Sequence, residues 1–201
     1  MAELIIVSGS PGTGKSIISS QLSQLLECNV IESSELFKSA GILLADPTGR
    51  DTFVIDEFKA QEFIREFVRR RGCFVVNTLH PVLWIDSAYD NVIFTLLLRC
   101  NPRVLLNRLN SRGWSRVKVI ENVLAEAFNV IAEELLEYED LVLEVDTSHG
   151  VIDRVMDETL SKLESWDTGI RIDWLSLDSG VIDLVTQLVH ELDLYKERLG
   201  V

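Results

Sequence analysis

Four residues near the start of the chain have the types and the spacing of a phosphate-binding loop. Gly9, Gly14, Lys15 and Ser16 fill the fixed positions of G-x-x-x-x-G-K-[ST]. An apolar run precedes the loop and a helically spaced apolar series follows it, which is the strand–loop–helix context that the motif requires. Glycine permits the tight bend in which backbone N–H groups surround a phosphate, while the Lys15 ammonium and the Ser16 hydroxyl suit phosphate and Mg²⁺. The alternative is a glycine-rich turn that binds nothing, but the intact motif and its flanks favour a phosphate site.

Arginines that can neutralise a bound polyphosphate lie in the second half of the chain. Arg108 and Arg112 are four residues apart, so they share one face of a predicted helix end. Gly113 is a natural helix stop, and Arg116 follows it at the start of the next predicted helix. Phosphoryl transfer requires mainly positioning and charge neutralisation from the protein. This helix–glycine–helix hinge therefore predicts a short lid over bound phosphates, with Lys15, Arg108 and Arg112 as catalytic residues.

The elements that must position these residues alternate between strands and helices. The apolar pattern predicts strands at 3–8, 28–32, 73–77, 91–98 and 141–145 and helices at 15–27, 56–71, 102–112, 116–138 and 150–164. The strands are nearly continuous apolar runs, which is typical of a parallel sheet covered on both faces. We therefore expect a three-layer α/β fold of the P-loop type with a central, mostly parallel five-stranded sheet. Residues 33–55 predict a small helical insertion. The amphipathic stretch 181–192 predicts a helix docked on the body or on a partner, and packing on the body is favoured.

Length and composition indicate one domain at residues 1–164 and a partly helical extension at 165–201. The longest apolar runs are too short to cross a membrane, and the first residues do not match a signal peptide. Cys28, Cys73 and Cys100 are odd in number and lack metal-ligand spacing, so we expect buried thiols in a reducing compartment. The resulting expectation is a soluble, cytoplasmic protein, or a nuclear one if the chain is eukaryotic.

Charge is unevenly distributed along this acidic chain. The formal net charge of −13 argues against strong direct binding to nucleic acid. Residues 91–120 nevertheless contain six basic residues and no acid: Arg99, Arg103, Arg108, Arg112, Arg116 and Lys118. Residues 119–144 contain eight acids and no base. The basic run is either a solvated helix face or a cationic patch for a polyphosphate, and the phosphate loop favours the patch. The acidic run fits a solvated face and a surface for a basic partner equally well.

These motifs together resemble the small nuclear-type adenylate kinases and their archaeal relatives, which are linked to maturation of the small ribosomal subunit. The resemblance covers about residues 3–163. It rests on the phosphate loop, on Val-Ile-Asp-Glu at 54–57, on Leu-Leu-Arg at 97–99, and on the block from Arg108 to Trp114 followed by Asn122 and Glu126. It implies a magnesium-dependent kinase that transfers the γ-phosphoryl group of ATP to AMP. It also implies an interaction with a basic small-subunit ribosomal protein.

The resemblance implies a set of site residues as well. ATP is expected to contact the loop and the start of its helix, through Pro11, Gly12, Thr13, Gly14, Lys15, Ser16 and Ile17. Residues 112–119 would form the lid, with Arg112 on the nucleotide, and His149 would line the adenine pocket. The monophosphate is expected within residues 33–56 and near four side chains, those of Ser34, Asp56, Arg99 and His80. His80 fits a phosphate partner and a capped loop residue equally well. Ser16 is expected to bind Mg²⁺.

One position departs from the family pattern. The family has Asp-x-His at the end of the third strand, where this chain reads Asn77-Thr78-Leu79-His80. Asn77 is expected to hold Mg²⁺ through a water but brings no charge, so a side activity as an ATPase is less expected than transfer to a monophosphate. Two further hypotheses remain. One is an ATP-regulated ribosome assembly factor with weak or no kinase activity, motivated by the acidic run, and the other is a kinase for a small metabolite.

Overall fold

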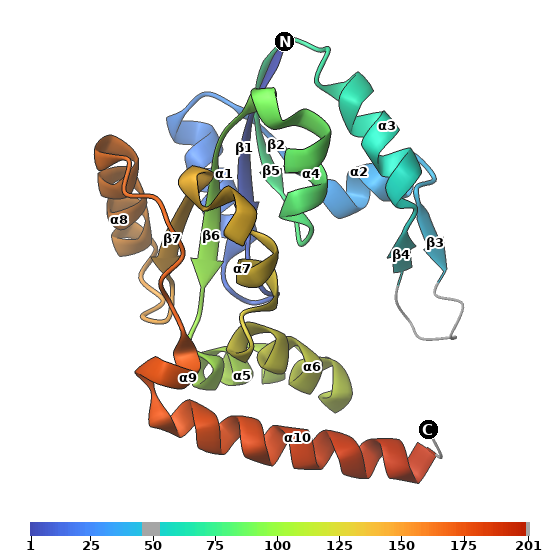
Figure 1. The fold of residues 1–201 in the computed structure, drawn as a ribbon, viewed down its shortest axis with the longest axis vertical. Helices are drawn as coiled ribbons and strands as arrows, with labels where there is room; N and C mark the ends of the chain where they lie inside the picture. The colour runs from blue at the N-terminus through green and yellow to red at the C-terminus, as the bar shows by residue number, and fades with distance from the viewer. Residues whose placement is uncertain (46–52, 200–201) are drawn as a thin grey trace. The chain divides into compact units, whose positions relative to one another are not determined.

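The computed structural model describes residues 1–45 and 53–199, so residues 46–52 of the predicted monophosphate segment lie outside the described chain. The fold is α/β with a central five-stranded parallel sheet, as predicted, and the strand order is β2-β5-β1-β6-β7. In that order the bounds are Asn29–Glu32, Gly72–Asn77, Ala2–Ser8, Val92–Arg99 and Val142–Asp146. β1 is the middle strand, and its carboxyl end leads directly into the predicted phosphate-binding loop (Figure 1). Ligands of open parallel sheets bind outside the carboxyl ends of the strands.

The described chain forms two compact units, residues 1–8 with 16–95 and residues 9–15 with the chain from 96 onward. Besides β1, β2 and β5, the first unit contains α1 (Lys15–Leu25, whose first residue belongs to the second unit), α2 (Ser33–Ser39), β3 (Leu43–Ala45), β4 (Phe53–Ile55), α3 (Glu57–Phe67), α4 (Pro81–Ala88) and a 3-10 turn, η1 (Tyr89–Asn91). β3 and β4 form an antiparallel pair, so the segment predicted as a helical insertion consists of the helix α2 followed by this pair of strands. The rings of Phe37 and Trp84 stack at 5.9 Å in the core of this unit.

Cys28 and Cys73 form a disulfide, which corrects the prediction of three reduced thiols. The parallel register pairs Asn29 with Phe74, so the residues just before them face each other across β2 and β5. Their Cα atoms are 4.7 Å apart, a separation that a disulfide spans. The pairing depends on strand register, which the spacing of the cysteines does not reveal. Cys100 is free and buried, as predicted.

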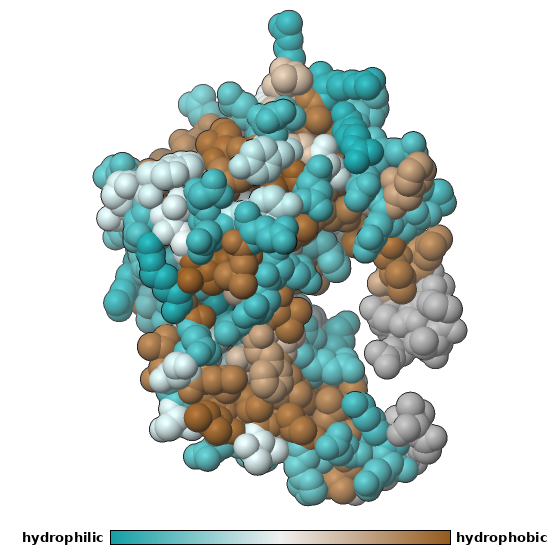
Figure 2. All heavy atoms as spheres, in the orientation of Figure 1, coloured by the Kyte–Doolittle hydropathy of each residue, from teal (hydrophilic) through white to brown (hydrophobic). Residues whose placement is uncertain are grey.

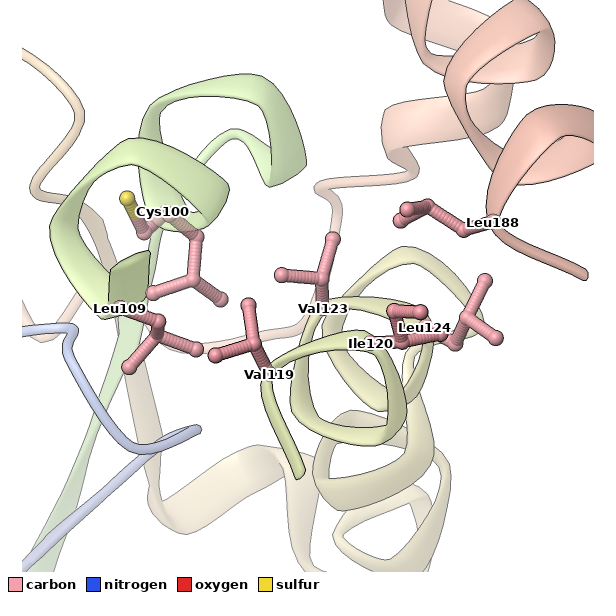
Figure 3. Packing of buried hydrophobic residues seen from close by; sticks show 8 residues of the cluster. Cys100, Leu109, Val119, Ile120, Val123, Leu124 and Leu188 are labelled. Atoms are coloured by element: carbon pink, nitrogen blue, oxygen red, sulfur yellow. The ribbon is translucent and has the colours of Figure 1, made fainter. Parts of the chain in front are cut away.

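The second unit is mainly helical. It contains α5 (Pro102–Asn110), α6 (Arg116–Ala127), α7 (Val130–Glu134), a 3-10 segment η2 (Leu136–Leu141), β7, α8 (Ile152–Ser165), α9 (Trp174–Leu177) and α10 (Ser179–Leu199). Leu188 of α10 packs into one buried cluster with Ile120 and Leu124 of α6, and Figure 3 shows these side chains pointing toward one another. Figure 2 shows hydrophobic residues gathered where α10 lies beside α5 and α6. The amphipathic stretch at 181–192 therefore packs on the body. None of the described helices is both long enough and apolar enough to span a membrane.

The single helix predicted at 116–138 is wrong. α6 ends at Ala127, and Asn129 adopts left-handed backbone angles, with φ of 57°, before α7 begins. Asn tolerates this conformation better than most residues. Its side-chain oxygen also accepts a hydrogen bond of 2.5 Å from Nη2 of Arg99. A tertiary contact thus stabilises the break, and the apolar period along the chain does not display it.

Candidate functional site

Close backbone approaches at two glycines shape the predicted phosphate-binding loop. Gly9 has a φ of 135°, and a Cβ at this position would lie 2.2 Å from the carbonyl oxygen of Leu98. Gly12 has a φ of 95°, and its Cβ would lie 2.8 Å from Cδ1 of Leu105 and 2.9 Å from Cδ2 of Leu109. Both positions combine left-handed backbone angles with a steric limit, so only glycine fits without strain.

Hydrogen bonds from Lys15 and Thr13 to carbonyl oxygens of the same loop stabilise its conformation. Nζ of Lys15 donates to the carbonyl oxygens of Gly9 at 2.7 Å and Ser10 at 3.1 Å. Thr13 donates to the same Ser10 oxygen from its backbone N at 3.3 Å and its Oγ1 at 2.9 Å. Helix α1 begins at Lys15, so its first-turn N–H groups have no partner within the helix. The loop therefore has the donors and the dipole orientation that an anion requires.

One carboxylate, that of Glu126, ties this loop to the rest of its unit. The Ser10 hydroxyl donates to Oε2 at 2.6 Å. Oε1 accepts from Nε of Arg99 at 2.9 Å, from the backbone N of Cys100 at 3.1 Å and from Nε1 of Trp174 at 2.9 Å. Glu126 is 3% exposed and Arg99 only 1%. A carboxylate this deeply buried needs several strong donors, and these four supply them.

Arg99 is a structural residue, which corrects its predicted role in substrate binding. Its Nη1 donates to Oε1 of Glu144 at 2.7 Å and to the carbonyl oxygen of Ile172 at 3.1 Å, in addition to the bonds with Glu126 and Asn129. Because the guanidinium is buried and its donors are used by these bonds, it is not available to bind a substrate. Glu126 and Glu144 therefore belong to the interior, although both fall within the acidic run that was considered as a surface.

Arg108 connects the phosphate loop with the loop that follows β7. Its Nη1 donates to the carbonyl oxygen of Gly12 at 3.3 Å, and its Nη2 donates to that of Thr147 at 2.6 Å. His149 lies in this second loop, where its Nδ1 accepts from the backbone N of Val151 at 3.2 Å. An accepting Nδ1 leaves the proton on Nε2. That Nε2 is buried and has no hydrogen-bond partner within the described structure. Arg108 and His149, which were predicted separately as site residues, therefore meet at the loop that follows β7.

Two other arginines of the basic run pair with the C-terminal extension instead of forming a patch. Nη2 of Arg116 lies 2.7 Å from Oε2 of Glu191, and Nη1 of Arg103 lies 3.7 Å from Oδ2 of Asp178. The bond from Arg116 holds the pKa of Glu191 below its usual range. With Arg99 buried as well, half of the predicted patch serves structure.

The predicted lid carries the remaining cations. Arg112 lies over the ring of Trp114 at 5.6 Å, and Nζ of Lys118 lies over the same ring at 4.7 Å. Cations over an indole face are attracted by its quadrupole. Ser115 caps α6 by accepting a hydrogen bond from the backbone N of Lys118, so the lid segment runs from α5 directly into a capped helix.

In the first unit, a second group of polar side chains gathers where β2 and β5 end. Nδ2 of Asn77 donates to both carboxylate oxygens of Glu32 at 2.9 Å and to Oγ of Ser16 at 3.1 Å. Glu32 was not predicted as a site residue. Its position at the carboxyl end of a predicted strand was a signal that could have identified it. Its contact with Asn77 could not be predicted, because that contact depends on strand order, which is a tertiary property. Among residues 1–45 and 53–199, no three His, Cys, Asp or Glu side chains gather as a metal cluster.

The remaining predicted residues lie on separate elements of the first unit. Ile17 of α1 is 51% exposed, and Ser34 of α2 is exposed. Asp56 caps α3 by accepting from the backbone N of Lys59 at 3.2 Å, and hydrogen bonds from Lys59 lower its pKa. His80 precedes α4, and its backbone N donates to Oγ1 of Thr78 at 3.0 Å.

Known proteins with similar sequences include archaeal relatives of nearly the same length. The AAA domain family matches residues 5–129, more than half of the chain. A protein of Sulfurisphaera tokodaii is 33% identical over 198 residues, covering 98% of each chain. A protein of Saccharolobus islandicus (strain L.S.2.15) is 36% identical over 160 residues, covering 79% of this chain and 82% of its own. Both carry the name "Putative adenylate kinase". A gluconokinase structure from Sinorhizobium meliloti 1021 matches with a TM-score of 0.56 at 20% identity, covering 82% of this chain and 93% of its own, which shows a shared fold alone.

Proposed function

This chain belongs to the AAA-domain family of P-loop proteins, and on that premise we propose that it is a kinase that transfers the γ-phosphoryl group of ATP to AMP. The observation that carries the proposal is the junction at Arg108. This cation bonds the phosphate loop at Gly12 and the loop after β7 at Thr147, so a positive charge lies between the two segments that would hold a nucleotide. The names of the archaeal relatives support the choice of AMP as acceptor.

In this proposal, the triphosphate binds along the loop of residues 9–15. Backbone N–H groups and Lys15 bind its phosphates, with Lys15 exchanging its bonds to the Gly9 and Ser10 carbonyls for phosphate oxygens. Nε2 of His149 is a buried donor in need of an acceptor, and a ring nitrogen of adenine is one. Arg112, on the exposed lid, would neutralise charge on the transferring group.

Magnesium enters the proposal as the ion carried by ATP, and the residues present fit it. In phosphoryl transfer this ion neutralises charge on the β- and γ-phosphate oxygens. It prefers oxygen ligands and keeps several waters. The hydroxyl of Ser16, the amide of Asn77 and the carboxylate of Glu32 meet in one corner of the first unit. The attacking oxygen of a nucleoside monophosphate is already anionic, so no protein base is needed.

An assay of AMP-dependent ADP formation tests the proposal. Arg112→Met is expected to lower kcat by about 1,000-fold, because one arginine at the transferring phosphoryl is worth that much or more. Arg103→Met is the matched control, because Arg103 lies on α5, its side chain is 61% exposed and it pairs with Asp178. Purified protein that binds ATP but forms no ADP with AMP would contradict the kinase assignment.

A second candidate function is binding of a basic protein, for which we infer a surface on α7 and η2. Five acids there are exposed: Glu133, Glu134, Glu137, Glu139 and Asp140. Leu136, at the centre of this run, is 46% exposed, which adds an apolar contact to the charge. Capture of small-subunit ribosomal proteins, with and without ATP, tests this function. A Glu133→Lys/Glu137→Lys variant should lose such binding while its ADP formation stays unchanged.

A further inference from the structure

We propose that Glu32 supplies the carboxylate charge at the magnesium site, in place of the residue at position 77. The inference rests on the proposed function and specifies which side chain of this chain acts on the nucleotide-bound ion. Glu32 was not among the predicted site residues. Its role follows from its place in the sheet and from the side chains that it contacts.

Strand register brings Glu32 to this corner. β2 and β5 are parallel neighbours, and Glu32 is paired directly with Asn77, the last residue of each strand. Asn77 is only 6% exposed, whereas Glu32 is half-buried and Ser16, in the first turn of α1, is exposed. The Asn77 amide donates to both, so the Glu32 carboxylate and the Ser16 hydroxyl are bound to one nitrogen.

Of the three side chains Ser16, Asn77 and Glu32, only that of Glu32 can place a negative charge beside a bound Mg²⁺. Asn77 is neutral and turns its donor toward Glu32. A second carboxylate at position 77 would face the first at hydrogen-bond distance, and like charges so close repel each other strongly. The two neighbouring strand ends therefore carry one acid, Glu32 at the end of β2, and one amide, Asn77 at the end of β5.

Glu32 retains the capacity to act on an ion. An ionised carboxylate has about four acceptor sites, and the bonds to Asn77 use one on each oxygen. The sites that remain can accept from waters of a hydrated Mg²⁺, which keeps most of its water when a nucleotide carries it. The alternative is that Glu32 merely anchors Asn77 at the end of the sheet.

Calorimetric titration of ATP, with Mg²⁺ and with EDTA, separates these two roles. The measured quantity is the factor by which Mg²⁺ strengthens ATP binding. Glu32→Gln should reduce this factor by about 10-fold or more, the range found when a partner of the metal shell is removed. Without metal, the same variant should bind ATP at least as tightly as the unaltered protein, because a negative charge near the phosphates is gone. Glu35→Gln, three residues later on α2 and exposed, is the matched control and should leave the factor unchanged.

Exchanging the two residues tests the charge itself. The double variant Glu32→Gln/Asn77→Asp returns the acid to β5 and should restore most of the Mg²⁺ effect. A Glu32→Gln protein that binds ATP with an unchanged Mg²⁺ factor, or a double variant with no recovery, would overturn the proposal while leaving the kinase assignment intact. Failure of the unaltered protein to bind Mg-ATP would overturn both.

Discussion

Ser10 of the phosphate loop and Trp174 of the C-terminal extension donate hydrogen bonds to the two oxygens of one carboxylate, that of Glu126. They are 164 positions apart in the chain, yet a single buried group joins them. The extension is therefore connected to the loop that we propose binds ATP. This connection can be measured.

Ser10→Ala and Trp174→Phe should affect stability in a non-additive way. Each variant removes one donor from a buried carboxylate and should cost about 1–3 kcal/mol of unfolding free energy. Because the donors share an acceptor, the double variant should differ from the sum by at least about 0.5 kcal/mol in urea unfolding. The control pair is Ser10→Ala with Trp166→Phe, since Trp166 is 47% exposed. Additivity of the first pair would show that Glu126 does not couple the two segments.

Arg99→Met should lower the free energy of unfolding by about 3–5 kcal/mol, because it leaves the buried carboxylates of Glu126 and Glu144 without their cation. Arg103→Met, at an exposed ion pair, should cost less than about 1 kcal/mol. Chemical denaturation of both variants measures the difference. If both variants lost the same small amount of unfolding free energy, Arg99 would again be a candidate substrate-binding residue.

Reduction should destabilise the protein through Cys28 and Cys73. The disulfide closes 45 residues of chain, and loops of this length contribute about 2–4 kcal/mol through the entropy of the unfolded state. Thermal unfolding with and without dithiothreitol should therefore show a lower Tm under reduction. The Cys28→Ser/Cys73→Ser variant should not respond to the reductant. A response in that variant would place the effect elsewhere.

The Cys100 thiol should be inert in the native protein. Burial raises its pKa to about 11, so at pH 8 it is almost entirely protonated, and only the thiolate reacts readily. Without reductant, Ellman's reagent should detect no thiol in the folded chain and one thiol in guanidinium. Detection of three thiols in guanidinium would mean that the disulfide is absent.

The bond between Arg116 and Glu191 should contribute to stability above about pH 4.5 and fade in acid. The pKa of Glu191 is lower in the folded chain than in the unfolded chain, so the unfolded chain binds more protons as the pH falls through this range. Glu191→Gln should therefore cost up to about 1 kcal/mol at pH 7 and progressively less as the pH falls below 4.5. Urea unfolding at pH 7 and at a series of lower pH values measures this. A cost that does not fall with pH would point to lost packing of α10 instead of lost charge.

The sequence predicted local features well. The five strands, most of the helices and the phosphate loop follow from apolar period and from glycine positions, which act over a few residues. The docking of α10 on its own unit was also predicted, because its apolar stripe needs a partner surface. The break at Asn129 was missed, since the helical period continues through it while a bond from Arg99 stabilises the turn.

By itself, the sequence determined that a phosphate loop follows a buried strand near residue 9 and that Arg108 and Arg112 have helical spacing. Only the tertiary structure decided which of those charges face inward. Arg99 turns to Glu126 and Glu144, and Glu32 meets Asn77 across 45 residues of chain. The physical reason is that hydrogen bonds and ion pairs are short-ranged, so their partners depend on strand order and helix packing. The motif could therefore be recognised from the sequence, but the charges arranged around it could not.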